Sequence, residues 1–251
     1  MKRVKNEDVL DGNPNRLTRK QHILSRGYLE GFYGANRKVQ LIKKDSEEVL
    51  DRSASNGIFW ALRAWDQRME QFFMKKIEDD FFAEISSNNS FERRNHLAIT
   101  LYHRLWWLRH DYGNASFENL KIEGISESAI TKDQEEKAEK RGFMSIREGG
   151  IVPSKYVISA DIRLELLRLE EEYHRNPIFW ALIDSVDGEY IVADCYKGLR
   201  YIPISPTKAF AADISVDEVI FERKLAALNR HSIDCSTHFY FARDFSSCPI
   251  A

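Results

Sequence analysis

The 251 residues carry a net charge of −2 and are 43% hydrophobic. This composition excludes an intrinsically disordered chain, because it supplies enough apolar side chains for a full core. The low net charge excludes a general attraction to nucleic acids or anionic membranes. The charge is unevenly placed, since residues 1–44 carry +7 and residues 45–251 carry −9. The sequence therefore joins a basic amino-terminal segment to an acidic body.

Cysteine usage and hydropathy indicate the compartment. The three cysteines, Cys195, Cys235 and Cys248, form no C-x-x-C pair, which fits free thiols in a reducing environment better than a disulfide framework or a zinc site. No apolar run reaches the roughly 18 residues of a membrane span. The first residues lack the apolar core of a signal peptide. We therefore expect a cytoplasmic protein without a membrane partner.

The first half of the chain predicts an arm, a short strand and two long helices. Residues 1–20 are polar and predict a flexible basic arm. After one or two helical turns, residues 39–42 form an apolar run flanked by lysines, which predicts a strand. Apolar side chains then recur at three- and four-residue steps over residues 58–85 and 91–113. This spacing predicts two amphipathic helices joined by a short loop, and therefore an antiparallel pair.

Residues 114–150 are the least hydrophobic part of the body. They contain good helix formers but almost no apolar stripe, so we expect either a solvated helix or a mobile polar segment. Further helices are predicted over residues 154–174 and 215–229, where apolar positions return at helical spacing.

The most β-prone stretch of the chain is residues 178–204. Its three extended runs surround Asp187-Gly188, a hairpin signal, and predict a meander of three antiparallel strands. Strands near 38–43 and 237–242 complete the expected antiparallel sheet, which four or five helices cover. The order of elements lacks the regular alternation of a doubly wound sheet, so we predict a single α+β domain.

Three histidines lie near one stripe of the second long helix. His96, His103 and His110 follow one another at seven-residue intervals, which separates neighbours by about 10 Å along the helix axis. Zinc ligands on one helix are normally three or four residues apart, so only His103 and His110, together with a ligand from elsewhere in the chain, could form a metal site. A polar outer face is therefore favoured over a metal site, and we expect neither a metal nor another cofactor.

The same helix combines cations with flat aromatic side chains, a combination enriched at interaction hot spots. The candidate partner-binding residues are Arg93, Arg94, Arg104, Trp106, Trp107 and Arg109. They suit an acidic peptide, or a nucleic-acid backbone with stacked bases. The sequence supports a structural alternative equally well, in which the tryptophans are core and the arginines pair with acidic neighbours such as Glu92 and Asp111.

Catalytic residue types are present without a catalytic motif. His22, Glu70, Glu78 and Asp194 are the candidate catalytic residues of a nuclease-like site. Glu70 and Glu78 lie eight residues apart on one predicted helix, so they need outside partners to act as a carboxylate pair. The sequence has no Gly-rich phosphate loop, no G-x-S-x-G and no H-E-x-x-H. These observations favour a non-enzymatic protein.

Several separated segments resemble a bacterial and phage domain family of unknown function, and together they span nearly the whole chain. The segments are Gln21-His22, Tyr28-Leu29 and Phe32, the helix of Glu70 and Glu78, Ala193-Asp194, Pro203-Ile204-Ser205-Pro206 and Leu228-Asn229. They correspond to the family's opening histidine with Tyr-Leu and Phe, its glutamate-bearing helix, a Ser-Asp strand end, Pro-Leu-Ser-Pro and a late asparagine.

The chain departs from that family pattern at two places. The proline expected soon after His22 is absent, and Ser25 stands near its position. Ala193-Asp194 lacks the serine of the family's Ser-Asp-x-Pro, and the proline of that motif is also absent. The resemblance therefore implies that a catalytic site, if the family has one, is lost in this chain.

Size and organisation also resemble the Tin-type prophage exclusion proteins of temperate phages. This resemblance implies a cytoplasmic, non-enzymatic protein of a bacterial host that binds the single-stranded DNA-binding protein of an invading phage. Binding would block replication of the phage DNA and so exclude superinfection. Our leading hypothesis is such a phage-defence protein, which acts through a protein partner and engages nucleic acid only indirectly.

Two other functions remain open from the sequence. One is a metal-dependent nuclease or another hydrolase that uses His22, Glu70 or Glu78, and Asp194. The other is direct binding of single-stranded nucleic acid through Trp106 and Trp107. Apolar residues are abundant on several predicted helices, which also suits a homo-oligomer.

Overall fold

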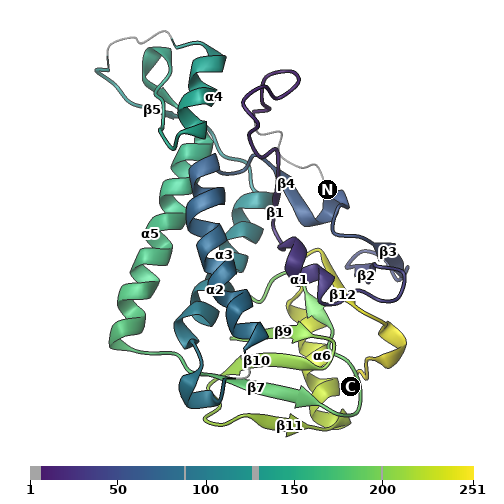
Figure 1. Ribbon diagram of the computed structural model, residues 1–251. Coiled ribbons are helices and arrows are strands. Elements are labelled where there is room, and N and C mark those ends of the chain that lie inside the picture. Colours follow the sequence, from purple (N-terminus) through teal and green to yellow (C-terminus); the bar gives the residue numbers. More distant parts are fainter. Residues whose placement is uncertain (1–6, 88, 126–129, 199) are drawn as a thin grey trace.

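The computed structural model describes residues 7–87, 89–125, 130–198 and 200–251 (Figure 1). Three parts of the predictions lie outside the described residues, namely residues 1–6 of the arm, residues 126–129 of the polar segment and Leu199 of the meander. Helices gather beside two four-stranded sheets (Figure 1), which confirms the predicted α+β class. The helices are α1 (Arg26–Glu30), α2 (Lys75–Ser86), α3 (His96–Asn114), α4 (Lys132–Lys140), α5 (Ser154–Arg175) and α6 (Glu222–Cys235).

The first four-stranded sheet has the strand order β11-β7-β10-β9. Its strands are β7 (Trp180–Ser185), β9 (Tyr201–Ser205), β10 (Lys208–Ala212) and β11 (Glu218–Ile220). β10 pairs antiparallel with both of its neighbours, and β11 pairs parallel with β7. Pro203 lies in β9, an edge strand, where a missing backbone N–H is tolerated.

The second four-stranded sheet has the strand order β3-β2-β12-β8, and all its pairs are antiparallel. Its strands are β2 (Val39–Lys43), β3 (Leu50–Arg52), β8 (Val192–Ala193) and β12 (Phe239–Ala242). The strands predicted near 38–43 and 237–242 are therefore confirmed. They are direct neighbours, since Tyr240 lies opposite Ile42.

The predicted pairing of the meander over residues 178–204 is wrong. Its first run, β7, pairs with β10 and β11, whereas its second run, β8, pairs with β12 of the other sheet. The turn at Asp187-Gly188 therefore connects two sheets instead of closing a hairpin. Gly188 has φ +146°, and a Cβ there would lie 2.9 Å from the carbonyl oxygen of Ser247, so the chain needs glycine at this crossing. The hairpin of the first sheet joins β9 to β10, a strand that the sequence pattern did not predict.

The helix predicted over residues 58–85 begins only at Gln67. Ahead of this helix the chain forms β4 (Trp60–Leu62), which pairs with β1 (Lys20–His22) in a small two-stranded sheet. A second two-stranded sheet pairs β5 (Leu120–Lys121) with β6 (Ile151–Val152). The Asp66 carboxylate accepts a hydrogen bond from the backbone N–H of Met69 at 2.7 Å, which satisfies a donor of the first helical turn. The segment Met69–Met74 is a π-helix and leads directly into α2.

α3 connects the helices to the sheets. It packs against α2, as predicted for the two long helices, and also against α5 (Figure 1). Phe81 of α2 stacks on Tyr102 of α3 with ring centroids 3.7 Å apart. One turn later, Trp106 contacts Tyr196 edge to face, just beyond β8. These buried contacts fix the last turns of α3, including His110, against the second sheet.

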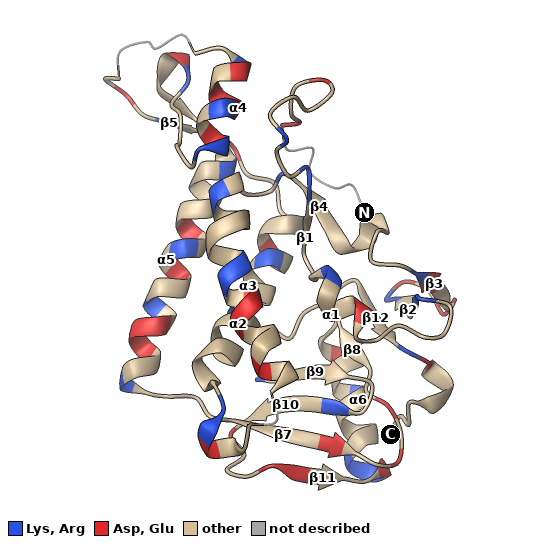
Figure 2. Ribbon diagram, in the orientation of Figure 1, with Lys and Arg blue, Asp and Glu red and all other residues tan. Residues whose placement is uncertain are grey.

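The polar segment contains a helix whose glutamates are buried. α4 begins at a capping box formed by Thr131 and Gln134. The ammonium of Lys155, on α5, lies 3.0 Å from the Glu135 carboxylate and 2.6 Å from that of Glu139, and all three residues are buried. Figure 2 shows basic and acidic residues together where α4 meets α5. The expectation of a solvated helix is therefore wrong, because ion pairs bury a face that has no apolar stripe.

The described part of the predicted arm contacts the body. The backbone N–H of Leu10 donates to the Glu136 carboxylate at 2.7 Å, and the Asn15 amide donates to the same carboxylate at 3.1 Å. Leu17 is buried. Leu10 and Asn15 thus dock this part of the arm on α4 through hydrogen bonds between two polar segments.

The cysteines and the helices agree with two further expectations. Cys195, Cys235 and Cys248 are free thiols, and the first and last of them are buried. Among the described residues, no helix combines the length and the apolar character needed to cross a membrane.

Candidate functional site

Three potential metal ligands, His110, Asp194 and His238, lie together where α3 meets the second sheet. Asp194 directly follows β8, and His238 directly precedes β12. These strands pair antiparallel, so the end of one lies beside the start of the other. The backbone N–H of Asp194 accordingly donates to the carbonyl oxygen of Phe239 at 3.1 Å. The register of the sheet therefore brings Asp194 next to His238, and α3 adds His110.

The Asp194 carboxylate is held in a fixed orientation. Asp194 is 1% exposed, and its two carboxylate oxygens accept hydrogen bonds from the backbone N–H groups of Thr237 and His238, both at 2.7 Å. The indole N–H of Trp106 donates to the carbonyl oxygen of Asp194 at 2.8 Å. A carboxylate has about four acceptor sites, so these bonds leave each oxygen able to bind a further group. The carboxylate is thus oriented in advance for a third partner.

The two histidines of the cluster differ in their charge. His110 Nε2 lies 3.3 Å from Asp194 Oδ2, and the rings of His110 and His238 stack with centroids 5.5 Å apart. Burial opposes the charged form of His110, but hydrogen bonding to Asp194 and Cys195 outweighs it and raises the pKa of His110 to about 10. Burial lowers the pKa of His238, and the neighbouring His110 adds to that effect while Asp194 opposes it. A protonated ring therefore lies beside a more weakly basic one.

The spacing of these side chains suits one metal ion. The ligand atoms of the three residues lie within 4.8 Å of one another. Two ligands of a tetrahedral zinc ion are each about 2.0 Å from it and therefore about 3.3 Å apart, which is the separation of His110 Nε2 and Asp194 Oδ2. His238 is partly exposed, so its side chain has room to rotate toward the other two. Two histidines and one carboxylate form the donor set of many zinc and iron sites.

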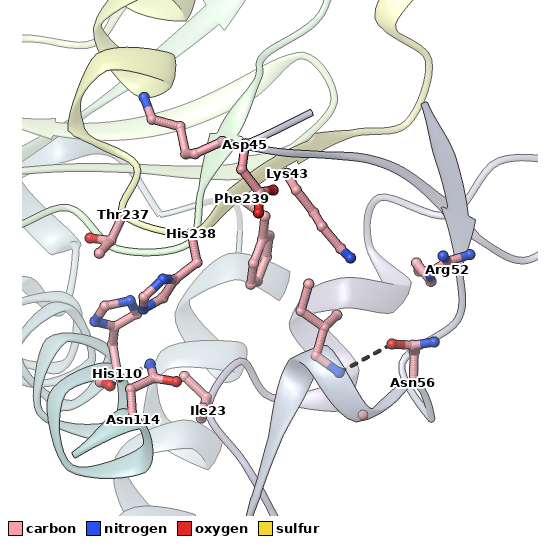
Figure 3. A pocket seen from close by; sticks show the side chains of 13 residues that line it. Ile23, Lys43, Asp45, Arg52, Asn56, His110, Asn114, Thr237, His238 and Phe239 are labelled. Atoms are coloured by element: carbon pink, nitrogen blue, oxygen red, sulfur yellow. Dashed lines mark hydrogen bonds between the residues drawn. The ribbon is translucent and has the colours of Figure 1, made fainter. Parts of the chain in front are cut away.

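The cluster borders a cavity of about 640 Å³ (Figure 3). His110 and His238 lie side by side on one wall, and Arg52 and Asn56 lie on the opposite wall. Lys43 extends between them from the end of β2 (Figure 3). The two histidines of the cluster thus face a space that also carries positive charge and can admit a small ligand, whereas Asp194 lies behind them.

The charge of Arg109 acts on three of the predicted catalytic residues, His22, Glu70 and Glu78. This buried arginine pairs with Glu78, and its charge also acts on Glu70, whose carboxylate accepts the indole N–H of Trp65 at 2.5 Å. Burial raises the pKa of Glu70. Burial also lowers the pKa of His22, and the positive charge of Arg109 lowers it further. Glu70 and Glu78 thus share one neighbouring cation, Arg109, which forms an ion pair with Glu78 and acts on Glu70 only through its charge.

The predicted set of His22, Glu70 or Glu78, and Asp194 is therefore divided between two places. Arg109 and His110 are consecutive residues of α3. Arg109 pairs with Glu78 of α2, whereas His110 contacts Asp194 of the second sheet. The structure brings Asp194 together with two histidines in place of the two glutamates.

The predicted partner-binding face is half internal. Arg94, Trp106 and Arg109 are each at most 6% exposed. Arg94 pairs with Asp217 at 2.7 Å, and the internal contacts of Trp106 and Arg109 are given above. These three residues therefore have internal structural contacts and do not form a binding surface. Trp106 is buried, so a nucleic-acid base cannot stack on it. The accessible members of the predicted face are Arg93, Arg104 and Trp107.

The sequence disfavoured a metal site because the histidines of α3 are far apart along the helix, and it left open only His103 and His110 with a ligand from elsewhere; the structure groups His110, without His103, with Asp194 and His238. His96 has a structural contact, since its Nδ1 accepts the backbone N–H of Trp180 at 3.0 Å. His110 finds its partners outside α3, at the end of β8 and ahead of β12. The sequence signal for these partners was weak, because it consisted only of a polar residue flanking each of two short strands.

Comparison of the chain with protein family models, with curated proteins and with solved structures found no match in any of the three. A function for this chain is therefore inferred from the geometry of the cluster and of its cavity.

Proposed function

We propose that this chain is a metal-dependent hydrolase whose metal ligands are His110, Asp194 and His238. The observation that supports the proposal most is that the ligand atoms of these three side chains lie within 4.8 Å of one another, and that two of the three residues, His110 and His238, line a cavity. Zinc sites of hydrolases commonly use three protein ligands and leave a further position for water or substrate. The cavity borders His110 and His238, so water or substrate in the cavity could reach this further position on the metal.

The chain's own residues would hold and orient the ion. Two backbone N–H groups fix the Asp194 carboxylate, and Trp106 fixes the backbone of the same residue. Such supporting contacts commonly raise metal affinity by 10- to 100-fold. His110 would give up the proton that it shares with Asp194, so that metal and proton compete for the same pair. A bound divalent ion would supply a water molecule of lowered pKa.

Activity tests this proposal through dependence on metal. Protein treated with a chelator is expected to be inactive toward chromogenic phosphate and carboxylate esters, and to gain activity when Zn²⁺ or Mn²⁺ is added. His238→Ala is expected to lower the activity by at least about tenfold, because it removes one of three ligands. The matched control is His231→Ala, since His231 is exposed and lies outside the cluster. Activity that persists without metal, or that His238→Ala leaves unchanged, would count against the proposal.

A second candidate function is the capture of a protein partner, as the leading sequence hypothesis expects. A cavity of about 420 Å³ between α3, α5 and the first sheet is lined by Arg104, Trp107, Tyr173 and Arg200. The Arg104 guanidinium lies over the Trp107 ring at 4.3 Å from its centroid. Cations beside exposed aromatic surface suit an acidic peptide. The partner proposed from the sequence is a phage single-stranded DNA-binding protein. This surface would recognise that protein through an acidic peptide segment.

Reversing the charge of Arg104 in this cavity, called the α3–α5 groove below, tests the second candidate function. Arg104→Glu is expected to weaken capture of the single-stranded DNA-binding protein by about tenfold, since it turns attraction of an acidic peptide into repulsion. The matched control is Arg168→Glu, because Arg168 is exposed on α5 and does not line the α3–α5 groove. Equal capture by wild type and Arg104→Glu would rule the α3–α5 groove out as the binding surface.

A further inference from the structure

We infer that the cavity beside the histidine cluster binds the phosphate group of a small phosphate monoester, such as a nucleoside monophosphate. The inference extends the proposed hydrolase by naming its substrate class, and its hydrolytic part rests on that proposal. Phosphate binding itself depends on a different set of residues, namely Lys43, Lys44 and Arg52.

The charges around the cavity favour an anion. Lys43, Lys44 and Arg52 line it, whereas Asp45 is the one carboxylate among its lining residues in the described part of the chain. Figure 2 shows the basic residues of β2 and β3 in this region. The basic amino-terminal segment recognised in the sequence thus contributes Lys43 and Lys44 to the cavity. A bound divalent metal would add to this positive charge.

These cations are not neutralised by ion pairs among the described residues. Arg52 donates to the carbonyl oxygen of Asp51 at 2.9 Å, and Lys44 donates to the carbonyl oxygen of Ile233 at 2.5 Å. Lys43 forms no salt bridge within the described ranges, and it extends into the space between the histidines and Arg52 (Figure 3). Carbonyl oxygens carry no net charge, so Lys43 and Arg52 keep a positive charge that can attract a phosphate, while Lys44 adds to the positive potential from a position bound to Ile233.

The size of the cavity favours a small ligand over a polymer. Sites for single small molecules commonly have volumes of about 300–1,000 Å³, and this cavity has about 640 Å³. Asn56, Asn114 and Thr237 line it with amide and hydroxyl groups, which suit the sugar and base of a nucleotide. These groups and the cations together fit a monophosphate whose remaining part is polar.

The implied reaction is hydrolysis of the phosphate ester. The oxygen of one water molecule bonds to phosphorus, and the ester P–O bond breaks. The electron pair of that bond stays on the leaving oxygen, which takes up one proton of the attacking water to give an alcohol, while the other proton of that water remains on the inorganic phosphate that is released. Lys43 and Arg52 would stabilise negative charge on the phosphate oxygens as the bond breaks.

Calorimetric titration of metal-free protein tests the binding. Adenosine monophosphate and inorganic phosphate are expected to bind, and adenosine is expected to bind at least about tenfold more weakly than its monophosphate. Lys43→Gln and Arg52→Gln are each expected to weaken binding of the monophosphate by about tenfold. The control Lys38→Gln, which changes an exposed lysine of the same basic segment outside this cavity, is expected to bind as wild type does.

The outcomes separate this inference from the proposed hydrolase. Equal binding of adenosine and its monophosphate, or no effect of Lys43→Gln and Arg52→Gln, would overturn the inference whatever the metal does. Tighter binding of a single-stranded oligonucleotide than of the monophosphate would overturn the assignment of a small ligand. Phosphate binding that both variants weaken would uphold it, even if no metal binds and the hydrolase proposal fails.

Discussion

Zn²⁺ or Mn²⁺ is expected to raise the melting temperature of the wild-type protein, and His238→Ala is expected to remove most of that stabilisation. A ligand present at 100 times its dissociation constant stabilises the folded state by about 2.7 kcal/mol. Loss of a contact that only supports a metal ligand weakens metal binding by up to about 100-fold. Loss of the coordinating side chain of His238 should therefore weaken metal binding by about 100-fold. The variant would then need about 100 times more metal for the same shift. Differential scanning fluorimetry over a range of metal concentrations measures the melting temperatures of wild type and variant.

The choice of variant separates metal binding from folding. His238 is partly exposed, so its truncation opens no cavity in the core. Asp194→Asn would not separate the two effects, because both carboxylate oxygens accept a backbone N–H and the amide nitrogen of asparagine would face one of these buried donors. His231→Ala serves as the control for loss of an exposed histidine. If His231→Ala and His238→Ala responded to metal as wild type does, another site would be responsible.

A loss of stability between pH 4.5 and pH 2 is expected from Glu135. Burial opposes ionisation of this carboxylate, but hydrogen bonds and charge attraction from Arg147 and Lys155 outweigh it and lower the pKa of Glu135 from 4.5 to about 2. A carboxyl whose pKa is lower in the folded state stabilises the protein above its unfolded pKa. This contribution, about 3 kcal/mol, is therefore present above pH 4.5 and is lost as pH falls toward 2.

Glu135→Gln is expected to lower the free energy of unfolding at pH 7 by about 3 kcal/mol and to flatten its dependence on pH below 4.5. Glu135 is 2% exposed, so solvent screens these ion pairs little. Denaturant titrations at pH 7, 4.5 and 3 measure both effects. Glu148→Gln is the control, because Glu148 is exposed in the same region of the chain. A variant with the same acid profile as wild type would show that another group dominates.

The predicted elements were most accurate where periodicity was long. Apolar spacing placed α3 and α5 within a few residues, and the run at residues 39–42 gave β2. The prediction of one helix over residues 58–85 failed because the apolar side chains of Trp60–Leu62 suit a strand as well as a helix. Only pairing with β1, forty residues earlier, decides between them.

Strand pairing was harder to predict than the strands themselves. Asp187-Gly188 is a strong hairpin signal, yet the chain crosses there between two sheets, because β10 occupies the place beside β7 that β8 would need. α4 was misjudged for a different reason. Its buried face consists of glutamates, and only the three-dimensional positions of Lys155 and Arg147 reveal that these charges are paired.

The candidate site illustrates the same limit. His110 and Asp194 are 84 residues apart, and Asp194 and His238 are 44 residues apart. Asp194 was singled out because it ends a strand, and His110 because of its helix, but the strand register of β8 and β12 brings Asp194 beside His238, and the packing of α3 adds His110. No spacing rule within one element contains that information.

Crystals of the protein grown with Zn²⁺ or Mn²⁺ test the central claim most directly, through anomalous diffraction at the absorption edge of the metal. The account predicts one strong anomalous peak about 2.0–2.2 Å from a nitrogen of His110, a nitrogen of His238 and a carboxylate oxygen of Asp194. In crystals of His238→Ala that peak should be absent or much weaker. A fully metal-loaded wild-type crystal without a peak between these three side chains would contradict the account.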